Sequence, residues 1–154
     1  MLNNQTITLD STFLWPDHDV IDNTNELALR YALRTLPNMN SIGVIHFDQE
    51  YYMSYLHMNK EDFIQAFQGL ERKGHVFKYS RETNELILED YISATNHSLT
   101  STKRDLIIKD IENTKSPEII EYLYKSLKSN PKPLRGKYAL LRYLKRIVKR
   151  NAIS

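Results

Sequence analysis

A short apolar segment, GVIHF at residues 43–47, constrains the fold of this chain more than any other part of its sequence. The segment is rich in β-branched and aromatic residues and is bounded by turn-forming residues, so it is predicted to be a strand. Helical segments precede and follow it. We therefore expect this lone strand to close the base of a sheet whose other strands come from later in the chain.

The helices beside this strand are predicted from their end signals. The first is expected at about 23–35, because Asn23 resembles an N-cap with Glu26 three residues later, and Pro37 and Asn38 then end it. The second is expected at about 49–56, capped by Asp48.

The third helix has the clearest amphipathic pattern. Asn59 is its expected cap and Gly74 its stop signal. Its apolar residues recur at helical spacing and form one stripe, namely Phe63, Ile64, Phe67 and Leu70.

Two further strands and a turn are predicted after Gly74. HVFKYS and ELILEDY show the two-residue period of strands, and RETN at 81–84 supplies the turn of a short hairpin. The order helix, strand, helix, helix, strand, turn, strand is that of a winged helix-turn-helix domain. The predicted class is therefore α+β, with this domain at 1–92.

The rest of the chain is predicted to be helical. Residues 93–102, SATNHSLTST, are read as a polar linker. Residues 103–154 are predicted to form a small all-α region, with one helix starting near Thr102, one at Ser116-Pro117 and a last one after NPKPLRG.

Charge is distributed unevenly between these regions. Residues 1–91 hold seven Lys/Arg against fourteen Asp/Glu, a net charge of −7, and residues 92–154 hold fourteen against five, a net charge of +9. This asymmetry indicates a basic arm that meets an acidic partner. The alternative is that the two halves attract each other.

The C-terminal basic run is the strongest physical signal. Ten Lys/Arg and no carboxylate occur between Lys125 and Arg150. On the last helix an apolar stripe (Leu140, Leu141, Leu144, Ile147, Val148) opposes the cations Arg142, Lys145, Arg146, Lys149 and Arg150. Three interpretations remain: a face that binds phosphates, with Tyr138 and Tyr143 able to stack on bases of a single strand; a helix docked on a protein partner or a second copy; and a membrane-surface helix.

Enzymatic chemistry is not expected. The chain has four glycines, at 43, 69, 74 and 136, and no Gly-rich stretch ending in Gly-Lys-Ser/Thr, so it lacks a phosphate-binding loop. It has no cysteine, and the DHD triplet at 17–19 has no second cluster to complete a metal site. No cofactor or metal is predicted. Without a recognisable signal peptide or an apolar run of about 20 residues, a cytoplasmic protein without membrane contact is expected.

The third helix is the candidate for reading bases. Its N-terminal residues would reach base edges in a major groove, but Glu61 and Asp62 there oppose phosphates and equally suit the helix dipole. The DNA-binding candidates of this domain are Lys60, Gln65, Gln68, Arg72, Lys73, and in the hairpin Lys78 and Arg81.

About half of the chain resembles a known family. The features are Leu14-Trp15, a Tyr-Ala-Leu-rich helix ending at Leu36-Pro37-Asn38, Asn40-Ser41-Ile42-Gly43, an amphipathic helix ending at Gly74, and a hairpin leading to Tyr91. Together they are similar to the N-terminal winged-helix domain of phage replication initiators, or replisome organizers, and of DnaD-like primosomal proteins. The resemblance implies origin-DNA binding and a C-terminal region that recruits the helicase or its loader. The last fifty residues do not match a DnaD-like C-terminal motif.

The sequence therefore predicts a non-enzymatic DNA-binding protein of phage replication initiation, acting in the bacterial cytoplasm. Its expected partners are double-stranded DNA, single-stranded DNA, a helicase or helicase loader, and a second copy of itself. Two alternatives remain open: a transcriptional regulator of the same fold, and an adaptor or host-factor inhibitor that uses the acidic module to bind proteins.

Overall fold

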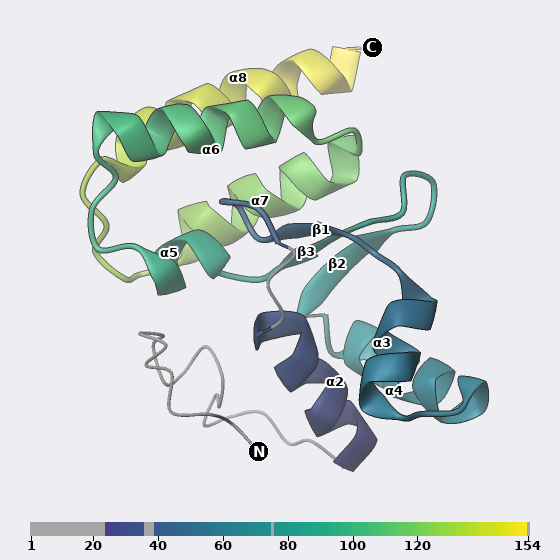
Figure 1. Cartoon of the computed structure of the whole chain (residues 1–154). Helices are drawn as coiled ribbons and strands as arrows, with labels where there is room; N and C mark the ends of the chain where they lie inside the picture. Colours follow the sequence, from purple (N-terminus) through teal and green to yellow (C-terminus); the bar gives the residue numbers. More distant parts are fainter. Residues whose placement is uncertain (1–23, 36–38, 75, 154) are drawn as a thin grey trace.

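The computed structural model describes residues 24–35, 39–74 and 76–153, and there the chain has an α+β fold with seven helices and one three-stranded antiparallel sheet (Figure 1). The predictions concerning residues 17–19, Trp15, Asn23, Pro37 and Asn38 lie outside these ranges. The elements are α2 (Thr24–Thr35), β1 (Val44–His46), α3 (Gln49–Leu56), α4 (Lys60–Lys73), β2 (Phe77–Ser80), β3 (Glu85–Leu88), α5 (Tyr91–Thr95), α6 (Ser101–Asn113), α7 (Pro117–Ser129) and α8 (Lys137–Ile153).

Local end signals fix several of these helices. The carboxylate of Asp48 accepts from the Tyr51 N–H at the start of α3, and the side chain of Asn59 accepts from the Asp62 N–H at the start of α4. Gly74 ends α4 with a φ of 73°, a left-handed conformation that favours glycine. The predicted bounds of α3 and α4 are thus confirmed.

The sheet has the order β1-β3-β2, so the central strand β3 has a hydrogen-bonded partner on each side. All four residues of β3 are buried. Leu86 and Leu88 point to one face and join the core with Ile45. Ile87 points to the other face and joins a second core with Val44.

The first face of the sheet is covered by α2, α3 and α4. Phe47, which follows β1, lies at the centre of an aromatic cluster with Tyr52, Phe63, Phe67 and Tyr79, at ring-centroid distances of 5.0–6.2 Å. These rings hold α3 and α4 against the hairpin. The expected stripe of α4 is buried here except at Ile64, which is half-exposed.

Helix α2 buries three charged residues. Glu26, Arg30 and Arg34 are all buried. A Cβ at Gly69 of α4 would collide with the Glu26 carboxylate, so the two helices are in close contact there. Burial, and then the neighbouring charge of Arg30, lower the pKa of Arg34 to about 9.

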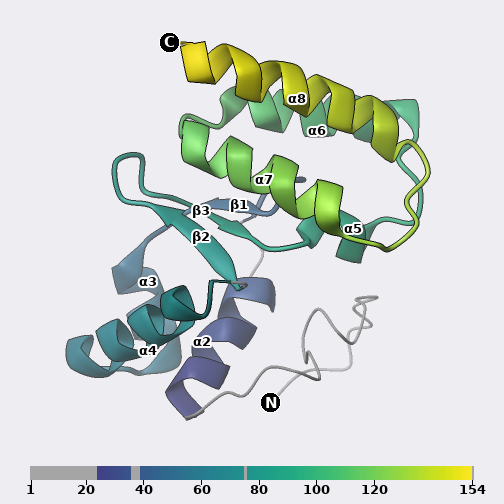
Figure 2. The same cartoon turned by 180° about the vertical axis from the view of Figure 1, so that it is seen from behind.

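The second face of the sheet is covered by the C-terminal helices (Figures 1 and 2). Ile42, Val44 and Ile87 pack with apolar residues of all three long helices, among them Ile107, Ile111, Ile119, Leu123, Leu140 and Leu144. The C-terminal region therefore folds onto the sheet and completes the core.

Residues 93–102, expected to be a polar linker, are instead part of this packed layer. They contain the end of α5 and the start of α6, which begins at Ser101 with Thr100 as its cap. Leu99 is 3% exposed, and its N–H donates to the carbonyl of Arg135 at 2.7 Å. The Ser/Thr-rich composition reflects helix capping and turns here.

Three carboxylates connect the sheet side to the C-terminal layer. Glu85 of β3, 6% exposed, accepts from the backbone N–H groups of Lys115 and Ser116 at 3.0 and 2.8 Å, just before α7. Asp110 of α6 accepts from the N–H and the hydroxyl of Ser41. Asp90 accepts from the Ser126 hydroxyl of α7 at 3.0 Å. Buried donors at the start of α7 thus depend on a side chain of the central strand.

We predict that Glu85→Ala lowers the free energy of unfolding by about 2–3 kcal/mol, because it leaves two backbone donors of Lys115 and Ser116 without their acceptor. Urea denaturation followed by circular dichroism measures the change. The control is Glu82→Ala, at an exposed position of the same hairpin, where a change of at most about 0.5 kcal/mol is expected. Equal effects of the two substitutions would contradict this role of Glu85.

Candidate nucleic-acid interfaces

Eight of the twelve residues predicted to bind DNA lie on two separate surfaces. Lys60, Gln65, Gln68 and Arg72 lie on the exposed side of α4, called here the outer face of α4. Arg142, Lys145, Arg146 and Lys149 lie on the exposed side of α8, called here the basic face of α8. Figures 1 and 2 both place α8 at the opposite end of the molecule from α4, with the sheet and α7 between them.

The outer face of α4 is chemically mixed. Two cations and two amides are exposed there, but Glu61 is exposed beside them, and Asp48 and Glu50 are exposed at the start of the neighbouring α3. The amides can hydrogen-bond base edges. The carboxylates weaken any attraction for phosphate.

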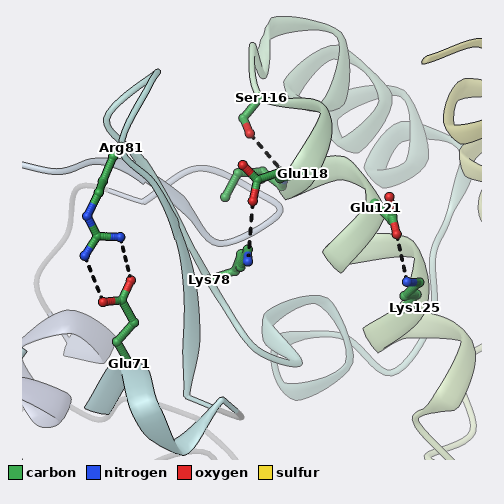
Figure 3. A network of polar contacts seen from close by, with 8 residues as sticks. Glu71, Lys78, Arg81, Ser116, Glu118, Glu121 and Lys125 are labelled. Carbon is green, nitrogen blue, oxygen red and sulfur yellow. Dashed lines mark hydrogen bonds and ion pairs between the residues drawn. The ribbon is translucent and has the colours of Figure 1, made fainter. Parts of the chain in front are cut away.

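Three of the predicted cations in α4 and the hairpin are paired with carboxylates (Figure 3 shows the hairpin pairs). Arg81 makes a bidentate pair with Glu71, with N–O distances of 3.0 and 2.9 Å, and this hydrogen bonding raises the pKa of Arg81. Lys78 lies 3.4 Å from Glu118 of α7, and Lys73 lies 3.7 Å from Glu26. A phosphate contact by any of these three has to compete with an existing pair.

A partly open cavity of about 240 Å³ lies between α4 and the hairpin. Its lining includes the rings of Phe47, Phe67 and Tyr79 and the amides of Gln49 and Gln68. Gln49 was not among the predicted residues, because only its cap neighbour Asp48 carries a sequence signal. The two phenylalanines are buried in the core and are unavailable as stacking platforms.

The basic face of α8 is electrostatically simpler. Its four residues are spaced three and four apart, which places them on one side of the helix. Within the described ranges, no carboxylate forms an ion pair with any of the four. Arg146 lies over the ring of Tyr143 at 6.0 Å.

Arg150, the fifth cation predicted on this helix, lies toward its edge. It lines a small cavity together with Tyr143 of α8 and Glu112 of α6. Burial, and then the charge of Glu112, raise the pKa of Tyr143. Arg150 therefore belongs to the junction of α6 and α8 and not to the basic face.

The apolar stripe of α8 is occupied inside the protein. Leu140 and Leu144 are fully buried, and Leu141, Ile147 and Val148 are partly buried against the same core. The membrane-surface interpretation needs this stripe to be available for lipid, and docking through the stripe needs it to be available for a partner. Neither is compatible with this packing.

Other kinds of site are not seen in the part of the chain that the structure describes. No group of three or more His, Asp or Glu side chains there could hold a metal ion, and none of the helices there combines the length and apolarity needed to cross a membrane. The chain matches no protein-family model, no curated protein and no solved structure. A function for this chain is therefore inferred from the geometry of its surfaces.

We predict that replacing all four residues of the basic face of α8 by Gln changes the free energy of unfolding by at most about 1 kcal/mol, because these side chains are exposed and form no ion pair within the described ranges. The control Leu144→Ala, at a fully buried position of the same helix, is expected to cost about 2–5 kcal/mol. Urea denaturation measures both. A large loss from the Gln variant would mean that the basic face serves the fold.

Proposed function

We propose that this protein is a non-enzymatic DNA-binding protein whose phosphate-binding surface is the basic face of α8. The observation that carries the proposal is that four exposed cations share one helix face without a carboxylate partner in the described chain. Such a face binds a polyanion well, because counterions condensed on the polyanion are released when the cations contact its phosphates.

The element order supports a winged helix-turn-helix within this fold. α2, β1, α3, α4, β2 and β3 follow one another with sheet order β1-β3-β2, and the hairpin from Phe77 to Leu88 takes the position of the wing. In this proposal α4 is the recognition helix, and Gln65, Gln68 and Arg72 read base edges of a duplex. The outer face of α4 would add selectivity, and the basic face of α8 would add affinity.

The proposed biological role is initiation of phage DNA replication in the cytoplasm of the bacterial host. It rests on the resemblance to replication initiators, which also implies recruitment of a helicase or its loader and self-association. A transcriptional regulator of the same fold would use the same surfaces, and the location of its binding sites, upstream of a gene or inside an origin, distinguishes the two.

A protein-interaction adaptor is the second candidate, and one surface favours it. Tyr51 and Tyr55, one helical turn apart on α3, are 41% and 56% exposed beside the exposed Glu50. Exposed tyrosines are enriched in protein interfaces. This candidate predicts a protein that binds neither duplex nor single-stranded DNA but still captures a stoichiometric partner.

The test compares two matched double variants in duplex binding across a salt series. Arg142→Gln/Lys149→Gln removes one Arg and one Lys from α8, and Arg72→Gln/Lys60→Gln removes the same pair from α4. The slope of log K against log salt is expected to become shallower by about 1.8 for the α8 variant, or about 0.9 per lost phosphate contact. A smaller change is expected for the α4 variant.

Two results would contradict the proposal. One is absence of DNA binding by the full chain at low salt. The other is a salt slope that the α8 variant leaves unchanged while the α4 variant flattens it. Because both variants change the net charge equally, a general charge effect would appear in both.

A further inference from the structure

Tyr138 at the start of α8 is the most exposed aromatic side chain of the described residues, at 79%. The core does not use it, since the stripe of α8 begins at Leu140. Tyr143, the other tyrosine of this helix, is partly buried against the second core. A ring left almost wholly in water is available to a ligand.

The ring continues the row of cations. Tyr138, Arg142, Lys145 and Lys149 are separated by four, three and four residues, so they lie along one line of the helix surface. From Tyr138 to Lys149 the helix rises by about 16 Å, at 1.5 Å per residue. One ligand can therefore contact the ring at one end and several cations beyond it.

The start of α8 is firmly anchored. At a parallel bridge between Ser98 and Arg135, the Leu99 N–H donates to the Arg135 carbonyl at 2.7 Å and the Arg135 N–H donates to the His97 carbonyl at 3.4 Å. Gly136 has a φ of 88°, and a Cβ there would lie 2.6 Å from the Leu99 carbonyl oxygen. The ammonium of Lys137 donates to the Asn130 carbonyl at 2.7 Å. Tyr138 thus extends from a fixed base, which reduces the entropy lost when a ligand binds it.

We propose that this surface binds single-stranded DNA, with Tyr138 stacking on a base and Arg142, Lys145 and Lys149 contacting the backbone phosphates. Bases in a duplex are already stacked on their neighbours, so a single exposed ring gains most from a strand whose bases are free. The inference rests on the proposed function and deepens it, because it names the form of nucleic acid that α8 prefers.

The experiment measures anisotropy of a labelled oligothymidylate and of a labelled blunt duplex of equal length with the full chain. Tyr138→Leu is expected to weaken binding of the single strand by about 5- to 150-fold, the range for loss of one stacked base. Tyr138→Phe should keep it within a few-fold. Neither should alter the salt slope, because no phosphate contact is lost.

The matched control is Tyr55→Leu, another exposed tyrosine on α3 at the opposite end of the molecule, and it should bind as the unsubstituted protein does. The inference is overturned if Tyr138→Leu leaves single-strand affinity unchanged, or if it weakens single strand and duplex by the same factor. In both cases DNA binding itself persists and the proposed function stands. Absence of binding to either DNA overturns both proposals.

Discussion

The burial of β3 on both faces and both edges is the constraint on which the structure depends. This strand is hydrogen-bonded to β1 and β2, and its apolar residues alternate between two cores. A sheet with apolar residues on both faces needs two covering layers. α2, α3 and α4 form one and the C-terminal helices the other, so the chain from Thr24 to Ile153 builds its two cores around a single strand.

This arrangement also determines which surfaces remain for function. α8 has to place its apolar side on the second core, and its cations consequently point away from the sheet. Carboxylates of the acidic part of the chain do not neutralise the basic face of α8. Lys78 of the hairpin forms an ion pair with Glu118 of α7, but within the described residues no carboxylate pairs with the cations of the basic face. The uncompensated charge at one end of the molecule is thus a consequence of how the core is built.

Features with local causes were predictable from the sequence. The bounds of α3 and α4 follow from Asp48, Asn59 and Gly74, because capping is decided within one helical turn. The strands and the turn between them follow from alternation and from RETN. The exposed cations of α8 follow from helical spacing alone. The prediction contained all four residues of the basic face, and also Arg150, which lies at its edge.

Features that depend on contacts between distant segments were not predicted. The ion pairs of Lys73, Lys78 and Arg81 join separate elements, as do the buried charges of α2, and nothing in a window of the sequence marks them. The sequence does contain one sign of the second core. In a strand with one solvent-exposed face, the position of Ile87 would be polar. Its apolar side chain therefore indicates a second covering layer and argues against a free linker at 93–102.

Because they share the second core, the sheet and the C-terminal helices are expected to form one cooperative unit. Native-state hydrogen exchange tests it most directly, by comparing amides of Ile87 and Leu88 in β3 with those of Leu123 and Leu127 in α7 as urea is raised. We expect one opening free energy and one urea dependence for all four, equal to those of global unfolding. Exchange of the α7 amides at a clearly lower free energy, with a smaller urea dependence, would show that the helical layer opens by itself and that the two parts do not unfold as one unit.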